Sequence, residues 1–299
     1  MKFARAEGVE GEIVAYAGVA WIVKGIIHPR GHVIAFPRYK LLDPVKKLSR
    51  TEVARLVEDH SRYWSYIDMR VPMIPRGAIF LKPTQTLSML SSLLRDSIPR
   101  TCRVIPTGSS ALGIEGSNDL DVVIACRDSR SCLNSYTCLA ELREIGMLRR
   151  SLGALFVEWL NRHRDTLNLD AYIATKADSP LVGTFLGRVY TIRIVNLEFK
   201  PSRVVSSKCM PLVITIVKPL LDFTTPCRYV AEARGLGKVI FESYRMLFTH
   251  LPPRARVRAL FRVELRADGL TYVIPDHSRD VVIELALHSR SSECPPRSL

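Results

Sequence analysis

The chain has 299 residues, of which 47% are hydrophobic and 24% are charged. This composition excludes a largely disordered protein, and the length suggests two domains or one large domain with additions. Lys and Arg outnumber Asp and Glu, 43 to 29, which gives a net charge of +14. Such an excess favours polyanionic partners, namely nucleic acid, nucleotides or an anionic membrane surface, although a basic protein without such a partner has the same balance.

Membrane and secretion signals are not found in the sequence. No stretch approaches the roughly 20 apolar residues of a membrane span, and the first residues do not resemble a signal peptide. We therefore expect a cytoplasmic protein without a membrane partner. None of the seven cysteines has CxxC spacing, so we expect reduced thiols rather than a zinc site or a disulfide framework.

The first region, residues 1–83, is an accessory region in our prediction. β-branched runs at residues 19–23 and 32–36 flank a turn at 28–31, which predicts a β-hairpin. A helix follows from Ser49 or Thr51, because Ser or Thr before Glu52 is typical of a helix cap.

The second region, residues 84–205, is predicted as a compact domain. Apolar spacing predicts a helix at 84–94, and short apolar runs predict strands at 102–105, 119–125, 167–174 and 189–195. The amphipathic stretch 133–162 predicts two helices that are broken near Gly146 or Gly153.

The third region, residues 206–289, contains short strand signals divided by turns, which predicts a small antiparallel barrel or sandwich. Residues 290–299 are expected to form a flexible tail. Alternate positions in this region carry arginines, which an extended chain would place on one face; they are Arg254, Arg256, Arg258, Arg262 and Arg266. The predicted fold class is α+β.

Two aspartates at the start of the strand at 119–125 are the first candidate site residues. Asp119 and Asp121 are two positions apart, so on a strand their side chains point to the same face while Leu120 points to the covered face. Carboxylates this close repel unless a cation lies between them. The alternative is that they pair with arginines or cap a helix.

A turn at residues 106–110 precedes this strand. Gly108 permits a close backbone approach, and the amides after it, with the hydroxyls of Ser109 and Ser110, offer donors to a phosphate group. Gly108 lies eleven residues before Asp119. A polyphosphate held at the turn would therefore lie near a metal held by Asp119 and Asp121, which we call the acid pair.

Asp170 is the only acid in the apolar run at 167–174, and we expect its strand to lie beside the strand of the acid pair. Asp119, Asp121 and Asp170 would then form an oxygen-only site suited to Mg²⁺ or Mn²⁺. An edge-strand acid that faces water is the alternative. Lys24, Arg38, Tyr39 and Lys176 could contact a polyanion, but turn or surface roles are expected for them.

Residues 108–124, with the later Asp170, resemble the signature of the DNA polymerase beta-like nucleotidyltransferase superfamily. The resemblance covers about residues 87–194, and the spacing from Asp121 to Asp170 is similar to that of archaeal-type CCA-adding enzymes. It implies a mixed sheet flanked by helices, with Gly108, Ser109 and Ser110 holding a nucleoside triphosphate. It also implies that Asp119 and Asp121 bind two metals and that Asp170 binds the catalytic metal. The helical and tail domains of CCA-adding enzymes are not found, so CCA addition itself is not expected.

The function predicted from this resemblance is metal-dependent transfer of a nucleoside monophosphate to a hydroxyl acceptor on nucleic acid, RNA favoured, with release of pyrophosphate. The first alternative is a non-catalytic RNA- or protein-binding module on the same scaffold. The second is a plain RNA-binding protein that uses the third region. The sequence leaves the acceptor, the preferred nucleotide and the oligomeric state open.

Overall fold

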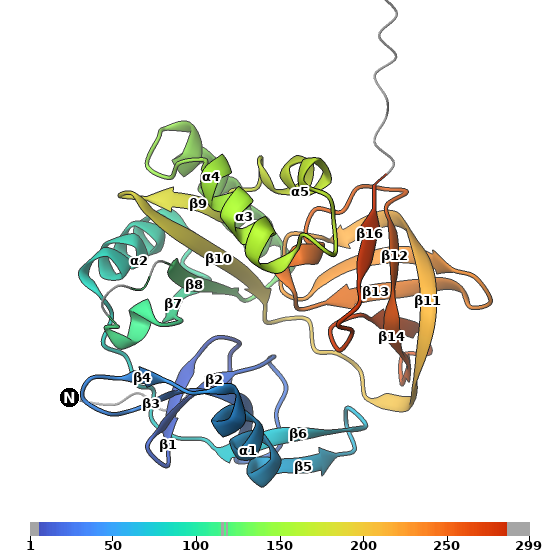
Figure 1. The fold of residues 1–299 in the computed structure, drawn as a ribbon, viewed down its shortest axis with the longest axis horizontal. Coiled ribbons are helices and arrows are strands. Elements are labelled where there is room, and N and C mark those ends of the chain that lie inside the picture. The colour runs from blue at the N-terminus through green and yellow to red at the C-terminus, as the bar shows by residue number, and fades with distance from the viewer. Residues whose placement is uncertain (1–5, 115–116, 118, 286–299) are drawn as a thin grey trace, which may run out of the picture.

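The computed structural model describes residues 6–114, 117 and 119–285, so the tail predicted at 290–299 lies outside the described residues. The chain is a mixed α and β protein with three sheets, as the α+β prediction required. Figure 1 shows the first sheet in blue below the green and yellow central sheet, with the orange and red third sheet to the right. None of the helices in the described ranges combines the length and apolar character needed to cross a bilayer.

The first sheet has the strand order β1-β2-β3-β6-β5, with β4 on the side of β3. Its elements are β1 (Ile13–Tyr16), β2 (Val19–Val23), β3 (His32–Lys40), β4 (Lys46–Lys47), α1 (Arg50–His60), β5 (Ser61–Trp64) and β6 (Met69–Pro75). The predicted hairpin is confirmed, because β2 and β3 pair antiparallel. The predicted cap is also confirmed: Ser49 and Glu52 form a capping box at the start of α1.

The central sheet is mixed, with the order β7-β8-β10-β9. β8 pairs antiparallel with β7 and parallel with β10, and β9 pairs antiparallel with β10. The elements of this part are α2 (Gln85–Ser97), β7 (Cys102–Thr107), β8 (Asp119–Cys126), α3 (Ser129–Glu144), α4 (Leu152–Arg162), α5 (Leu169–Lys176), β9 (Val182–Phe185) and β10 (Arg188–Asn196). The break predicted in the stretch 133–162 is confirmed between α3 and α4, where Gly146 has a φ of 78°.

The two faces of the central sheet pack against different parts of the chain, and the acid pair lies on the face away from α2 and α3. On β8, Leu120, Val122 and Ile124 share one hydrophobic core with the apolar residues of α2 and α3. The opposite face carries Asp119 and Asp121, followed by apolar positions that pack against residues of the first region. Leu120 therefore points to the covered face, as predicted, and the two acids point away from α2 and α3.

The strand predicted at 167–174 is wrong, because these residues belong mostly to the helix α5. Asn168 caps α5 by accepting a hydrogen bond from the Ala171 amide at 2.8 Å. Ala171 and Tyr172 are buried in the hydrophobic core of the third region. A short apolar run does not distinguish a strand from a buried helix. Here the Asn168 cap and the burial of one helix face in the core of the third region stabilise the helix.

The third sheet closes on itself. Its strands are β11 (Val204–Leu221), β12 (Cys227–Ala233), β13 (Gly237–Ser243), β14 (Arg256–Arg266), β15 (Thr271–Ile274) and β16 (Val282–Glu284). The order is β11-β12-β13-β15-β14-β16, and β11 also pairs with β14, which completes a circuit of five strands. The predicted barrel is therefore observed with one correction: β13 and β15 pair parallel.

The arginines of β14 do not form one solvated stripe. Arg256 and Arg258 are exposed, whereas Arg262 is half-buried and Arg266 is buried. Nη2 of Arg262 donates to the carbonyl oxygen of Ile67 at 2.7 Å, so the first region covers this end of the strand. The even positions do share one face of the strand, but only part of that face is available to a solvent-borne polyanion.

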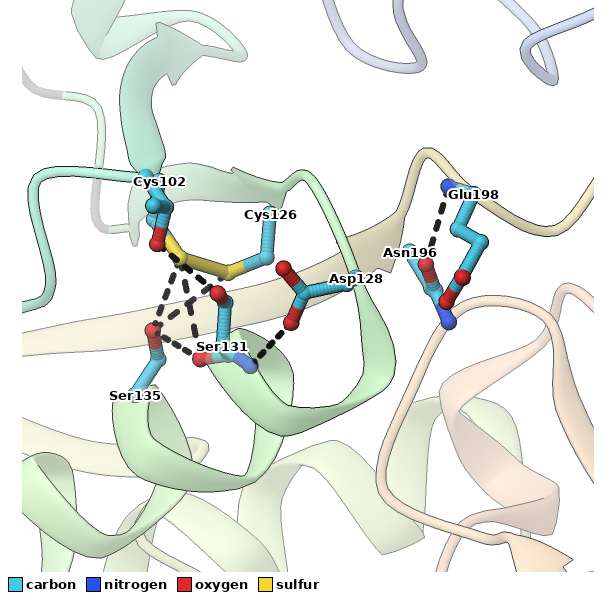
Figure 2. The surroundings of a disulfide bond; sticks show 8 residues. Cys102, Cys126, Asp128, Ser131, Ser135, Asn196 and Glu198 are labelled. Carbon is cyan, nitrogen blue, oxygen red and sulfur yellow. Dashed lines mark hydrogen bonds between the residues drawn. A yellow bond between two sulfur atoms is a disulfide. The ribbon is translucent and has the colours of Figure 1, made fainter.

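Cys102 and Cys126 form a disulfide (Figure 2), so the expectation of reduced thiols is wrong for this pair. The two residues lie directly opposite each other on β7 and β8. Ser135 of α3 places its Oγ 3.2 Å from the sulfur of Cys102 and 3.3 Å from that of Cys126. The bond lies at the end of β8 away from Asp119, and the sequence could not reveal it because pairing depends on strand register.

Removal of this disulfide is expected to lower stability. The bond closes a segment of 24 residues, and its loss restores conformational freedom to the unfolded chain worth about 3 kcal/mol. The Cys102→Ser/Cys126→Ser variant should therefore unfold at a lower urea concentration than the oxidised protein. Cys209→Ser, at an exposed free cysteine, is the control and should leave the midpoint unchanged. Equal midpoints for all three proteins would contradict the expectation.

Candidate active site

The acid pair stands on β8 without a partner in the described chain. Asp119 and Asp121 are both partly exposed on the same face of the strand. In the ranges that the structure describes, neither carboxylate accepts a hydrogen bond or forms an ion pair. Burial and the neighbouring Asp119 raise the pKa of Asp121, against the lowering effect of Arg193, Arg162 and Arg38. Two carboxylates in this setting favour a bound cation.

Gly108 brings the backbone of the turn against the acid pair. It has a φ of 71°, and a Cβ atom built on it would collide with Oδ2 of Asp121 and lie 3.0 Å from Cβ of Asp121. Only glycine allows both this conformation and this approach. The sequence-based expectation of a close backbone approach at Gly108 agrees with this geometry.

Replacing Gly108 with Ala is therefore expected to destabilise the fold and displace the Asp121 side chain. The left-handed conformation alone costs a residue with a Cβ about 1–2 kcal/mol, and the collision adds to that cost. Gly146→Ala is the matched control, since Gly146 has a φ of 78° but nothing within 4 Å of its Cβ position. In urea unfolding, Gly108→Ala should lose clearly more stability than Gly146→Ala, and equal losses would contradict the contact.

The serines after Gly108 hold the turn together. Ser109 Oγ lies 2.5 Å from Ser117 Oγ, and Ser110 Oγ donates to the carbonyl oxygen of Asp119 at 2.7 Å. Ser110 begins a 3-10 helix, Ser110–Leu112, and is fully buried. Ser109 is partly exposed beside Gly108, whereas the buried Ser110 side chain fixes the turn to the start of β8. The phosphate contact predicted for the Ser110 hydroxyl is therefore not supported by its position.

Two basic side chains, Lys24 and Arg193, line the same cavity as the acid pair but form no ion pair with it in the described ranges. Arg193 lies on β10, the strand beside β8, and its Nη1 donates to Glu10 Oε1 at 2.8 Å. Lys24 Nζ contacts the same oxygen at 3.1 Å. Glu10 is buried, yet these two cations hold its pKa below the ordinary value against the opposing effect of burial. The buried carboxylate thus positions Lys24 and Arg193 beside the acid pair.

All three regions line one cavity of about 520 Å³ around Asp119 and Asp121. Its charged residues are the carboxylates Asp119, Asp121 and Glu158 and the basic residues Lys24, Arg38, Arg162, Lys176, Arg193 and Arg245. Basic side chains exceed carboxylates two to one on this wall, which favours an anionic ligand. The volume lies within the range of about 300–1,000 Å³ that is typical of small-molecule sites.

Lys24, Arg38 and Tyr39 line this cavity, although turn or surface roles were expected for them. Lys176 also lines it and is buried, contrary to the expectation of a solvated charge. Its Nζ donates to the carbonyl oxygens of Met246 and Thr249 at 2.8 and 2.6 Å, and burial lowers its pKa to about 7. No local pattern indicates this residue, because its partners lie 70 and 73 positions away.

Asp170 does not join the acid pair. It lies in the first turn of α5, is exposed, and is absent from the cavity wall. Across the described ranges, no three His, Cys, Asp or Glu side chains come together in a way that could hold a metal. The later strand beside β8, where we expected Asp170, is β10. At the position opposite Asp121, β10 carries Thr191 rather than an acid. The predicted role of Asp170 as a metal ligand is therefore not supported by its position.

Glu158 of α4 is the carboxylate that the sequence-based analysis missed. It lines the cavity with His163 and Tyr172, and burial raises its pKa while these two neighbours lower it, with a net lowering. Arg162, one turn further along α4, lies 3.8 Å from it. Helical spacing connects Glu158 with Arg162, but no local pattern indicates that α4 faces β8.

Comparisons with protein-family models, with curated proteins and with solved structures find no match to this chain.

Proposed function

We propose that the chain is a metal-dependent nucleotidyltransferase that moves a nucleoside monophosphate from a triphosphate to a hydroxyl group on nucleic acid, with RNA favoured, and releases pyrophosphate. One observation carries the proposal: two carboxylates without protein partners in the described ranges face a cavity lined with basic side chains. A divalent cation neutralises such a pair, and a polyphosphate matches the charge of the surrounding wall.

The residues present fit a magnesium ion. Mg²⁺ in proteins commonly takes one or two carboxylates and completes its shell with substrate phosphates and water. Asp119 and Asp121 would hold it without a third carboxylate. Thr107 lies opposite Asp121 on β7, and its buried Oγ1 has no hydrogen-bond partner in the described chain, so one further oxygen is available there. Bound at this place, the ion would supply positive charge to phosphate oxygens and lower the pKa of a bound hydroxyl.

The remaining groups of the cavity suit a triphosphate. Gly108 lines the cavity and its backbone approaches Asp121, so the turn can offer backbone amides to phosphate oxygens. The Ser109 hydroxyl contacts Ser117 Oγ at 2.5 Å and is absent from the cavity wall, so a contact with phosphate requires this bond to break.

Arg38 and Arg162 act on Asp121 electrostatically and are themselves exposed. Arg38 has no ion pair in the described ranges and is free to move onto an anionic substrate. Arg162 can exchange its 3.8 Å contact with Glu158 for direct hydrogen bonds to that substrate.

The test is label transfer. The protein is incubated with Mg²⁺, each α-labelled nucleoside triphosphate in turn, and total RNA, DNA or protein as the acceptor. The proposal expects label on RNA or DNA that requires Mg²⁺ and is lost with EDTA. Label on protein alone would keep the reaction type and overturn the acceptor class. Absence of transfer from every triphosphate would overturn the reaction.

The position of Asp170 favours a second candidate, a non-catalytic module that binds nucleotide or RNA. Such a module needs the acid pair and the basic wall but no complete catalytic centre. Thermal unfolding separates the two candidates when it is combined with label transfer. A binding module is stabilised by Mg²⁺ with triphosphate and transfers no label, whereas the enzyme shows both effects.

A further inference from the structure

A second cavity of about 670 Å³ lies between the first sheet and the barrel. Lys24, Phe36, Tyr244 and Arg245 line both this cavity and the one around the acid pair. The two spaces are therefore neighbours that share a wall. A ligand that occupies the second cavity can extend a functional group towards Asp119 and Asp121.

The side of this cavity formed by the first region is apolar and partly aromatic. Its apolar lining residues include Ile26, Ile27, Ile34, Val57, Trp64 and Met69. Phe36 on the shared wall is 37% exposed, which is high for a large apolar side chain inside a cleft. Trp64 is held by stacking on Tyr66 with a centroid distance of 5.3 Å. Exposed rings in a basic protein are suitable platforms for unpaired bases.

The side formed by the barrel is an ionic network. Arg266 donates to Glu264 Oε2 and to Glu242 Oε1, both at 2.8 Å, and Arg262 donates to Glu264 Oε1 at 2.7 Å. Arg228 donates to the other oxygen of Glu242, also at 2.8 Å. Three guanidinium groups thus share two carboxylates, and the cavity as a whole is lined by five basic side chains and four carboxylates.

Arg266 also has an unused donor. It is 4% exposed, and its buried Nη1 has no hydrogen-bond partner in the described chain. An unpaired donor on a buried cation is costly, so an oxygen acceptor from a ligand would stabilise it. Arg70 at the exposed edge and Arg245 on the shared wall line the same cavity, and no ion pair is found for either in the described ranges.

We propose that the second cavity holds the 3′-terminal nucleotide of a single-stranded nucleic-acid acceptor. The base packs against the aromatic and apolar side, backbone phosphates contact Arg70 and Arg245, and the terminal hydroxyl passes the shared wall towards the acid pair. The strand is unpaired because a base inside a duplex cannot reach a recessed ring. The role of this nucleotide as an acceptor rests on the proposed function, whereas its binding does not.

Photo-crosslinking tests the location. A ten-nucleotide oligouridine with 4-thiouridine at its 3′ end is mixed with the full chain in EDTA without triphosphate, irradiated, and the crosslinked peptides are identified by mass spectrometry. Crosslinks are expected within residues 24–36, 61–72 or 242–245. The same oligonucleotide with 4-thiouridine at its 5′ end should not crosslink there. Crosslinks confined to the exposed face around Arg256 and Arg258, or none, would overturn the proposal.

Binding of variants tests the contacts. Phe36→Ala should weaken binding of the fluorescent oligouridine roughly tenfold, as loss of one stacking platform does. Arg70→Ala should weaken it and reduce the slope of log Kd against log salt by about 0.7, as loss of one phosphate contact does. Arg258→Ala is the control, since Arg258 is also exposed but lies outside the cavity. Equal effects of Arg70→Ala and Arg258→Ala would contradict the site.

The binding assay also separates this inference from the proposed function. Asp121→Asn should retain oligonucleotide binding in EDTA, because Asp121 does not line the second cavity. Binding in the cavity without any label transfer would disprove the enzyme and keep the site. Label transfer with crosslinks elsewhere would keep the enzyme and disprove the site.

Discussion

Replacing Asp121 with Asn is expected to reduce label transfer at least about a hundredfold, the usual cost of removing one electrostatic group from an active site. Asn keeps the shape of the side chain but removes the charge that holds the cation. Asp119→Asn should have an effect of similar size, because both carboxylates point to the same place on β8. The measurement is the initial rate of label transfer at saturating Mg²⁺.

Asp170→Asn is the matched control, and it distinguishes the structure from the sequence pattern. Asp170 is exposed on α5 and lies outside the cavity, so its variant should transfer label at the rate of the original protein. A loss as large as that of Asp121→Asn would contradict the observed position of Asp170 and restore the three-carboxylate site expected from the sequence.

The same variants give a stability signature. The pKa of Asp121 is raised in the folded state, mainly by burial, so above this pKa the ionised carboxylate costs stability relative to the unfolded chain. In EDTA at pH 7, Asp121→Asn should therefore unfold at a higher temperature than the original protein. Added Mg²⁺ should stabilise the original protein and leave the variant unchanged.

Glu242→Gln is expected to destabilise the barrel by about 3–5 kcal/mol, the range measured when one partner of a buried ion pair is removed. Glu242 is 1% exposed and joins Arg228 to Arg266. Its loss leaves the buried guanidinium groups of Arg228 and Arg266 with less negative charge to balance them. Urea unfolding monitored by circular dichroism measures the change.

Glu284→Gln is the control for this prediction. Glu284 pairs with Arg256 on the same barrel at 3.3 Å, but both side chains are more than half exposed. An exposed pair of this kind contributes roughly 0–1 kcal/mol. If both glutamate variants lost the same stability, the ionic network would not be a main determinant of the barrel.

Lowering the pH should also destabilise the barrel, because protonation of Glu242 removes the charge that Arg228 and Arg266 share. Arg266 and Arg228 hold the pKa of Glu242 below its ordinary value against the opposing effect of burial. The stabilisation is therefore complete above the unfolded pKa of 4.5 and is lost as the pH falls from there through the lower folded pKa. Glu242→Gln should show a smaller loss of stability over this acidic window than the original protein.

The sequence predicted those features that a local pattern determines. The alternation on β8, the glycine before it and the capping box of α1 each depend on a few adjacent residues. The strand predicted at residues 167–174 was wrong because eight residues of mixed character fit a strand or a helix equally well. β11 was not predicted at all: Pro211 and Pro219 lie within it, and proline argues against a strand unless the strand is bent or at an edge.

The basic wall of the site could not be predicted, because it depends on packing between distant segments. Glu10 and Arg193 are 183 positions apart, and Lys176 and Thr249 are 73 apart. The disulfide shows the same limit, since Cys102 and Cys126 meet only when β7 and β8 adopt one register. The sequence thus indicated the two acids and the turn, while the cations and the second cavity required the tertiary structure.

The circuit of strands in the barrel has a consequence for the order of events during synthesis. Val204 pairs with Arg266, and β15 lies between β13 and β14, so the circuit cannot close until the ribosome has released the last residues of β15. Pairings between such distant residues form late, because the loop must be closed before any contact compensates for its lost entropy. A nascent chain can fold its central sheet earlier, and it then exposes both aspartates before Arg245 and the barrel are in place beside them.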